Sequence, residues 1–155
     1  ERVITGIAGK KGFSVLTIEK DLMNAEIGFG RKVLEVFEDN DLSFEHLPSG
    51  IDTMSLVISS AALEGRRDKL MQSVARAVHP DSVFIEDGLA LVAVVGRGMI
   101  KAKGTAARVC DALARADVNI RMIDQGSSEL NIIVGVDEDE YETAVAAIYG
   151  EFVRS

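Results

Sequence analysis

The spacing of hydrophobic residues along the chain changes several times, and each spacing predicts a different element. Apolar and β-branched residues run together from residue 13, which is typical of a strand. Beyond residue 28 the apolar positions recur at intervals of three and four, as on one face of a helix. Over the first half, these patterns predict a strand at 13–19, a helix from 28 to about 40, strands at 42–47 and 53–59, a helix at 66–78 and a strand at 82–86. This βαββαβ order is typical of a ferredoxin-like unit.

The second half predicts the same order but stops before its last strand. The predicted elements are a strand at 89–95, a helix at 105–116, strands at 118–124 and 129–136, and a helix at 138–152. A surplus strand, 3–8, stands at the start of the chain, and a bare sheet edge beside an unpaired strand is unfavourable. We therefore expect 3–8 to complete the second unit. The prediction is an α+β fold of two ferredoxin-like units packed as a tandem pair, a contiguous first unit (13–87) and a second unit formed by 1–12 plus 88–155.

The two halves are also related residue by residue, at an offset of 76 positions and with no gap. Gly28 falls on Gly104 and Met23 on Met99. The apolar matches include Val33 on Val109, Phe37 on Leu113, Leu42 on Val118, Leu56 on Ile132 and Val57 on Ile133. Such self-similarity indicates one structural unit used twice. The seam between two similar units is a natural place for a ligand.

Composition narrows the class of protein. The chain has 155 residues, 47% of them hydrophobic, enough for one large or two small domains. No apolar run approaches the roughly 18 residues of a membrane span. The net charge of −8 argues against nucleic acids and anionic membrane surfaces as partners. The start carries neither an initiator Met nor a signal peptide, so we expect a fragment or a processed piece.

Cys110 is the single cysteine of the sequence, so no internal disulfide is expected. This usage fits a reducing compartment and predicts a cytoplasmic location. Cys110 lies on the apolar stripe of the helix predicted at 105–116, where a buried thiol is the expected role.

Several stretches of the sequence carry distinctive motifs. The segment 119–134, Asn-Ile-Arg-Met-Ile-Asp-Gln-Gly-Ser-Ser-Glu-Leu-Asn-Ile-Ile-Val, is similar to the second ACT domain in the regulatory region of aspartate kinases (aspartokinases). So are 95–99, Val-Gly-Arg-Gly-Met, and 104–108, Gly-Thr-Ala-Ala-Arg. The stretch from Phe29 through Thr53 resembles the first ACT domain.

The resemblance implies a non-catalytic piece of a larger enzyme. The parent would phosphorylate aspartate with ATP and Mg in lysine, threonine and methionine synthesis, and would carry a kinase domain that this sequence does not contain. No cofactor, metal or catalytic residue is expected in the fragment itself. The implied partners are an amino-acid effector, lysine by preference, the kinase domain of the same chain and a second copy that forms a homodimer through the ACT units.

Alternative functions remain at this stage. The effector is lysine, threonine or both together, or the units form a structural dimerisation module without effector binding. An RNA-binding βαββαβ domain would need aromatic residues on its central strands. The strands predicted at 118–124 and 129–136 contain none.

The chemistry of a free amino acid suggests where an effector would bind. Its carboxylate favours the backbone N–H groups of a helix start, which Gly28-Phe29-Gly30 would supply. Its cation favours a carboxylate, for which Glu45 and Asp52 are candidates. In lysine-sensitive aspartokinases, the matching positions that contact lysine are Met23, Gly28, Phe29, Gly30, Ser43, Phe44 and Glu45.

Four of these candidates also have a purely structural interpretation. Met23 alone is more often core filler, and Phe29 alone fits a staple at the helix start. Glu45 alone fits a solvated strand residue, and Asp52 a turn residue bonded to its own backbone.

The second unit is not equivalent at this site. Arg121 stands where the first unit has Glu45, so a lysine side chain would meet a like charge there. Asn119 takes the place of Ser43, Ile120 that of Phe44 and Gln125 that of Ser49. We expect the second unit to be a packing partner or a site for a neutral effector such as threonine.

Overall fold

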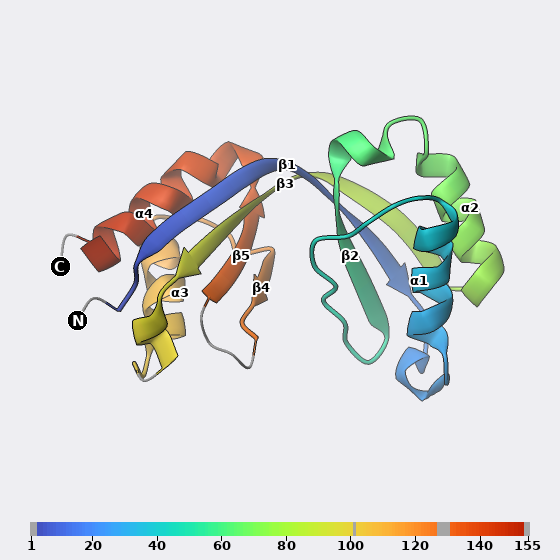
Figure 1. Ribbon diagram of the computed structural model, residues 1–155, viewed down its shortest axis with the longest axis horizontal. Helices are drawn as coiled ribbons and strands as arrows, with labels where there is room; N and C mark the ends of the chain where they lie inside the picture. Colours follow the sequence, from blue (N-terminus) through green and yellow to red (C-terminus); the bar gives the residue numbers. More distant parts are fainter. Residues whose placement is uncertain (1–2, 101, 127–130, 154–155) are drawn as a thin grey trace. The chain divides into compact units, whose positions relative to one another are not determined.

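The computed structural model describes residues 3–100, 102–126 and 131–153. The chain divides into two compact units, the first formed by Gly12–Asp87 and the second by Glu1–Lys11 with Gly88–Ser155. Two long strands, β1 (Gly6–Glu19) and β3 (Ser82–Val95), contribute to both units (Figure 1).

The continuity of these strands corrects the sequence analysis, which placed a break in each of them. At the two unit boundaries lie Gly12 and Gly88, whose φ angles are +91° and +77°. Glycine adopts a positive φ at little steric cost. The chain therefore passes these points without ending the strand, although a glycine in the sequence looks like a break.

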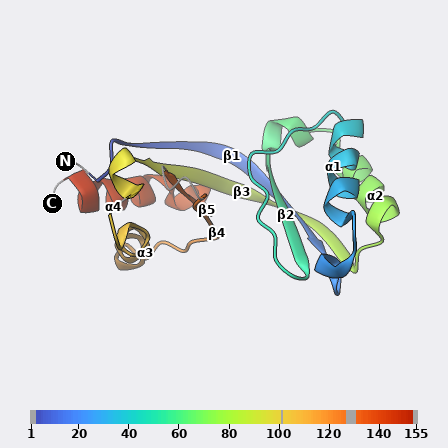
Figure 2. The same cartoon turned by 60° about the horizontal axis from the view of Figure 1, so that its bottom comes forward.

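The first unit contains α1 (Phe29–Asp39), β2 (Thr53–Ser59) and α2 (Arg67–Val78). Its sheet has the order β2-β1-β3, and the segment 42–50 follows the outer edge of β2 through two isolated bridges, His46 with Val57 and Ser49 with Met54. Both helices lie on the same side of these strands (Figure 2). Short 3₁₀ turns at Met23–Ala25 and Ser60–Leu63 precede the two helices.

The second unit contains α3 (Thr105–Arg115), β4 (Met122–Asp124), β5 (Asn131–Asp137) and α4 (Tyr141–Val153). Its strand order is β1-β3-β5-β4, so the N-terminal part of β1 lies where a contiguous unit would have its own last strand. The 3₁₀ turns are Arg97–Ile100 and Glu138–Glu140. With segment 42–50 counted as the edge of the first unit, the two strand orders are the same. The predicted α+β, ferredoxin-like class is confirmed.

Local differences from the predicted elements are concentrated at the edges. The strand predicted at 42–47 does not form: within this range the structure has one isolated bridge to β2, between His46 and Val57. The strand expected at 118–124 is reduced to Met122–Asp124, and the helix expected from 138 begins at Tyr141 after a 3₁₀ turn. The start predicted for the next strand, residue 129, lies outside the described residues.

The repeat is visible in the backbone itself. Gly28 and Gly104 precede α1 and α3 with φ angles of 84° and 82°, and Asp41 and Asp117 follow these helices with φ angles of 55° and 58°. Because Asp41 and Asp117 are not glycines, their left-handed conformation is an uncommon feature to find twice.

The predicted absence of a gap is wrong beyond Gln125. Val15 of β1 pairs with Val57, and the matching residue of β3, Leu91, pairs with Gly135. Leu91 follows Val15 by 76 positions, whereas Gly135 follows Val57 by 78. The turn before β5 is therefore two residues longer, and Leu56 and Val57 match Val134 and Gly135 rather than Ile132 and Ile133. An insertion of two residues keeps the same strand face buried, so the hydrophobic pattern conceals it.

Each unit has its own hydrophobic core. In the first unit, strand residues such as Leu56 pack against Phe37 of α1 and Val74 of α2. In the second, Val134 packs with Leu113 of α3 and Ile148 of α4. Both cores consist of a helix pair laid over a sheet, which is why the amphipathic helices were predictable from spacing alone.

A polar cluster supports the first unit next to its boundary. The buried Ser14 hydroxyl donates to Asp87 Oδ1 at 2.5 Å, and Arg67 donates to both carboxylate oxygens of Asp87 at 2.7 and 3.1 Å. These bonds, from Arg67 first and then Ser14, hold the pKa of the Asp87 carboxyl below its usual range.

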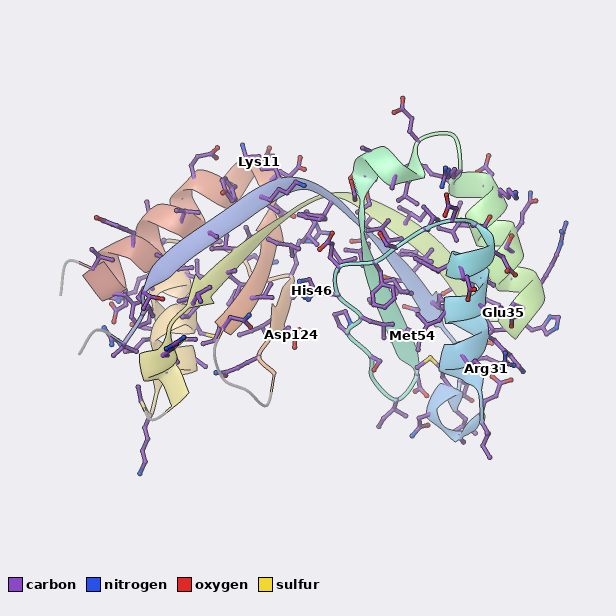
Figure 3. The ribbon with its side chains drawn as sticks, in the orientation of Figure 1. Lys11, Arg31, Glu35, His46, Met54 and Asp124 are labelled. Carbon is purple, nitrogen blue, oxygen red and sulfur yellow. The ribbon has the colours of Figure 1, made fainter. Side chains whose placement is uncertain are left out.

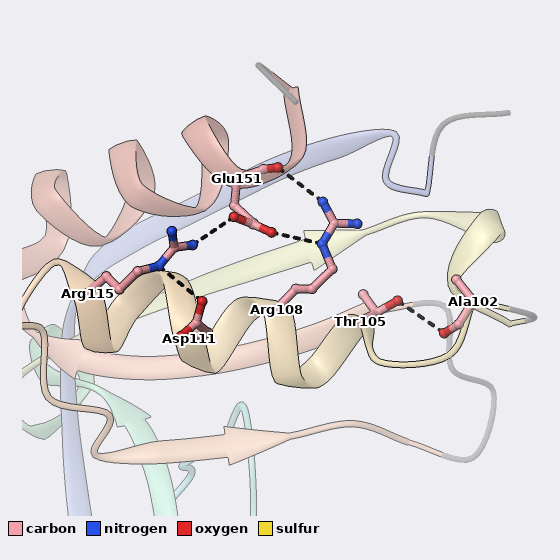
Figure 4. A network of polar contacts seen from close by, with 6 residues as sticks. All are labelled: Ala102, Thr105, Arg108, Asp111, Arg115 and Glu151. Carbon is pink, nitrogen blue, oxygen red and sulfur yellow. Dashed lines mark hydrogen bonds and ion pairs between the residues drawn. The ribbon is translucent and has the colours of Figure 1, made fainter.

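In the second unit, a carboxylate of α4 links the unit's two helices. Glu151 accepts from Arg108 Nε and from Arg115 Nη2, each at 2.9 Å (Figure 4). Arg108 also donates to the Glu151 carbonyl at 3.1 Å. The two guanidinium groups, Arg108 foremost, lower the pKa of the Glu151 carboxyl from its ordinary 4.5.

Core packing predicts a contrast between two residues of α1. Replacing Phe37, 2% exposed, by Ala should lower the free energy of unfolding by about 3–5 kcal/mol, since it leaves a cavity. Replacing Leu34, 38% exposed, by Ala should cost less than about 1 kcal/mol. Urea unfolding of both variants checks this, and equal losses would contradict the packing described.

The ion pairs of Glu151 predict a pH-dependent stability. Because the folded-state pKa is lowered, the stabilisation is present above pH 4.5 and is lost as the pH falls through the folded value. Wild type should therefore be more stable than Glu151→Gln near neutral pH, and the difference should shrink between about pH 5 and pH 3. Urea titrations over that range measure it. A difference that stays constant with pH would show that the charge of Glu151 does not contribute.

Candidate functional site

The start of α1 exposes backbone donors. Gly28 is the N-cap residue, in the left-handed conformation and without a side chain to cap the helix. The Phe29 N–H is bonded to the Glu26 carbonyl at 3.3 Å, and the first bond within the helix runs from the Lys32 N–H to the Gly28 carbonyl. The N–H groups of Gly30 and Arg31 thus remain for an acceptor at the positive end of the helix dipole.

Asp52 has a structural role at the neighbouring turn. Its carboxylate accepts from the Leu22 N–H at 3.0 Å, and its carbonyl accepts from the Lys20 N–H at 2.9 Å. Leu22 is held there at a φ of 57°, which is unusual for a leucine. The Asp52 carboxylate therefore fixes the loop that precedes α1. Its observed role is structural, but the bond goes to the backbone of Leu22 and not to that of its own turn.

A lysine of the chain itself occupies the space behind this loop. Lys20 Nζ donates to the Val78 carbonyl at 2.6 Å and to Glu26 Oε2 at 3.1 Å, and lies 5.9 Å from the centre of the Phe29 ring. The acid nearest the helix start, Glu26, is thus already paired. Sequence reasoning missed Lys20 and Glu26, because the position of the Lys20 ammonium is fixed by its bond to Val78, where the end of β1 meets the end of α2.

Glu45 lies at an irregularity of the edge segment. Its N–H donates to the Val57 carbonyl at 2.8 Å, while the Val57 N–H donates to the His46 carbonyl at 2.9 Å. Two residues thus face one, as in a β-bulge, a feature that redirects side chains and occurs beside functional sites. Glu45 is exposed, and its carboxylate has no partner within the described part of the chain.

The residues that precede Glu45 are exposed as well. Phe44 is 40% exposed and contacts Phe37 edge-on at 6.4 Å between ring centres. Ser43 is exposed. The segment therefore presents a hydroxyl, a ring and a carboxylate together.

The corresponding position of the second unit is differently arranged. The Arg121 N–H donates to the Gly135 carbonyl at 2.7 Å, which repeats the bond of Glu45. The Arg121 guanidinium is bonded to Asp137 at 3.0 Å and approaches the Gly88 carbonyl at 3.5 Å. Its charge is used inside the unit, whereas that of Glu45 is available.

The three candidates of the second unit have different surroundings. The Asn119 N–H donates to Glu140 at 3.2 Å, Ile120 packs against the core, and Gln125 is exposed.

In the first unit, the predicted residues fall into two groups along β2. Met23 and Phe29 are buried in the core, and a Cβ on Gly30 would lie 3.7 Å from Met54 Cε. Glu45 lies opposite Val57. Val57 is three residues beyond Met54 along β2, which separates these two strand residues by roughly 10 Å. The helix start and the carboxylate are thus near each other but not in contact.

A hollow of about 530 Å³ in this unit lies elsewhere, between α1 and α2. Its lining includes Arg31 and Glu35, an ion pair at 3.1 Å on the outer face of α1 (Figure 3). None of the predicted effector residues lines it.

The described residues show no cluster of acidic, histidine or cysteine side chains arranged to hold a metal ion. Among the helices described, none is long and apolar enough to cross a membrane.

The two units have the same strand order, and each has a glycine-capped helix beside a sheet edge. Comparison with known proteins agrees with this fold. Residues 92–152 match the model of the ACT domain family and belong to it. Over nearly its whole length, the chain is in addition similar to aspartokinases, as the sequence motifs predicted.

Three comparisons carry that statement. Aspartokinase 3 of Bacillus subtilis is 43% identical over 150 residues, 96% of this chain and 33% of that protein. The crystal structure of Clostridium acetobutylicum aspartate kinase, 53% identical, superposes with a TM-score of 0.93 over 96% of this chain and 34% of that one. The regulatory subunit of aspartate kinase from Thermus flavus, 18% identical, shares the fold with a TM-score of 0.83 over 96% and 98% of the two chains.

The chain thus spans about a third of the length of the full aspartokinases that it matches. Over nearly its whole length it is similar to the regulatory region of aspartokinases, and the resemblance found from the sequence is confirmed.

The exchange of Glu45 for Arg121 predicts different costs at equivalent positions. Arg121→Met should lower the free energy of unfolding by about 1 kcal/mol, because it leaves Asp137 without its partner. Glu45→Gln should change it by less than about 0.5 kcal/mol. Urea unfolding of both variants tests this, and a larger loss for Glu45→Gln would show that its carboxylate has a structural role.

Proposed function

We propose that the chain is the regulatory region of an aspartate kinase, that each of its two units is an ACT domain, and that lysine binds the first unit as a feedback inhibitor. The parent enzyme would transfer a phosphoryl group from ATP, with Mg, to the carboxylate of aspartate. Similarity to aspartokinases over 96% of the chain supports the parent. The shared strand order supports two equivalent units.

The observation that carries the lysine proposal is the unpaired carboxylate of Glu45 beside the start of α1. A lysine has a carboxylate at one end and an ammonium on a flexible four-carbon stem at the other. Its carboxylate would accept from the N–H groups of Gly30 and Arg31, and its side-chain ammonium would reach Glu45. The residues of β2 beside these two groups, Met54 and Val57, lie roughly 10 Å apart along the strand, a span that an extended lysine with one hydrogen bond of about 2.9 Å at each end would bridge.

Neighbouring groups complete this proposed site. Ser43 and Phe44 would line it from the edge segment, and the buried Met23 and Phe29 would support the loop beneath it. Because Lys20 already neutralises Glu26, Glu45 is the carboxylate left to select a cationic effector.

The second unit fits a different role. Its Arg121 would repel a lysine ammonium, so a neutral effector such as threonine, or packing alone, suits this unit. Threonine alone, lysine with threonine, and a structural module without effector are the alternative functions.

Regulation requires more than binding. Lysine can shift the kinase only if it binds one arrangement of the protein more tightly than another. The kinase domain of the parent and a second copy of the ACT units are the partners through which such a difference would act.

Calorimetric titration of the chain with lysine tests the proposal. We expect saturable binding, weakened at least tenfold by Glu45→Gln, because a charge-assisted hydrogen bond is lost. Glu38→Gln, at an exposed position of α1, is the matched control and should bind normally.

Titrations with threonine, alone and in the presence of lysine, discriminate the alternatives. Threonine binding without lysine binding would contradict the lysine proposal. No response to either amino acid, from a well-folded chain, would favour the structural module.

A further inference from the structure

Both units have a hollow between their two helices, at matching positions. The hollow of the first unit is lined by Val36, Asp39 and Asn40 of α1 and by Ser73, Arg76 and Ala77 of α2. That of the second unit is lined by Ala112, Arg115 and Ala116 of α3 and by Ala147, Gly150 and Glu151 of α4. The two sets correspond in order, at offsets of 76 positions for the first helix of each pair and 74 for the second.

The offset of 74 between α2 and α4 follows from their packing. Leu70 and Val74 of α2 are fully buried, as are Ala144 and Ile148 of α4 at the matching positions. Ala77 therefore stands where the second unit has Glu151.

In the second unit, a carboxylate of the chain itself lies at this hollow. The Glu151 carboxylate, on α4, accepts hydrogen bonds from Arg108 and Arg115 of α3 (Figure 4). The volume of the hollow beside it is about 320 Å³. The unit thus shows that a carboxylate is stabilised between these helices.

In the first unit, Ala77 stands in place of that carboxylate, and the cations are differently placed: Lys32 replaces Arg108, Asp39 replaces Arg115, and Arg76 replaces Gly150. Ala77 has no polar side chain, and the volume is larger, about 530 Å³. Lys32, at the position of Arg108, lines the hollow, and its ammonium approaches Glu26 only to 3.9 Å. Arg76, from α2, also lines the hollow, and within the described residues its guanidinium has no partner.

We propose that the hollow between α1 and α2 is a binding site for a small free amino acid. The carboxylate of the ligand would lie where Glu151 lies in the second unit, between Lys32 and Arg76. Its ammonium would face Asp39, which also lacks a partner in the part of the chain described and stands at the position of Arg115. The volume falls within the range of about 300–1,000 Å³ typical of small-molecule sites.

This site is separate from the one proposed for lysine, because neither Glu45 nor Gly30 lines the hollow. It therefore does not depend on the lysine proposal.

Amide chemical shifts of the ¹⁵N-labelled chain, titrated with L-threonine at constant ionic strength, test the proposal. We expect saturable shifts at Ser73, Arg76 and Ala77. Arg76→Gln, which removes a cation, and Ala77→Glu, which supplies a tethered carboxylate as in the second unit, should each weaken this binding at least tenfold. Glu45→Gln is the control and should leave it unchanged.

The reciprocal change provides a second measurement that does not depend on the folding of those variants. Glu151→Ala should open the second hollow and produce acetate-dependent shifts at Ala147 and Gly150, because Arg108 and Arg115 then lack the carboxylate that they bind. Acetate, which lacks the ammonium, should bind at least tenfold more weakly than threonine in the first unit.

The absence of shifts around Arg76 would overturn the proposal, as would shifts that Arg76→Gln and Ala77→Glu leave unchanged. Acetate binding as tight as that of threonine would remove the role of Asp39 and overturn the amino-acid assignment. Shifts confined to residues 28–30 and 43–45 would support an effector site there and contradict the one between the helices.

Discussion

The sharing of β1 and β3 between the two units is the constraint on which the rest of the structure depends. Among the described residues from 88 onward, the second unit has no last strand of its own, and the N-terminal part of β1 supplies it. In the sequence, the first unit stands between the two segments of the second unit, and it uses the remaining parts of the same two strands. Gly12 and Gly88 let both strands cross the boundary, and the cluster of Ser14, Arg67 and Asp87 fixes them directly beside it.

The sequence predicted most of this where spacing is strong and local. The helices Phe29–Asp39 and Thr105–Arg115 have clear apolar stripes and glycine starts, so their position was expected within a residue or two. The long strands were divided wrongly, because the effect of a glycine depends on whether neighbouring strands continue to pair with its flanks. The two extra residues of the turn before β5 were missed, since alternation looks the same after a shift of two.

In the candidate site, too, local features were predictable from the sequence and contacts between distant segments were not. The exchange of Glu45 for Arg121 is visible once the halves are aligned, and the structure adds that Arg121 is held by Asp137, while the Glu45 carboxylate has no partner among the residues described. The bond of Lys20 to the Val78 carbonyl, and the pairing of Glu151 with two arginines, join elements far apart in the sequence. No local pattern predicts such pairs. Each unit has thus kept the same backbone and changed a few polar residues, Glu45 to Arg121 at the edge and Ala77 to Glu151 between the helices.

The shared strands also have a consequence for cooperativity. Melting β1 would remove a strand from both cores at once, so the two units cannot unfold as independent domains. A ligand that binds only the folded first unit stabilises it by mass action, and part of that stabilisation extends to the second unit through their common strands. Binding on one side would thereby reduce local opening on the other, without any direct contact between ligand and the second unit.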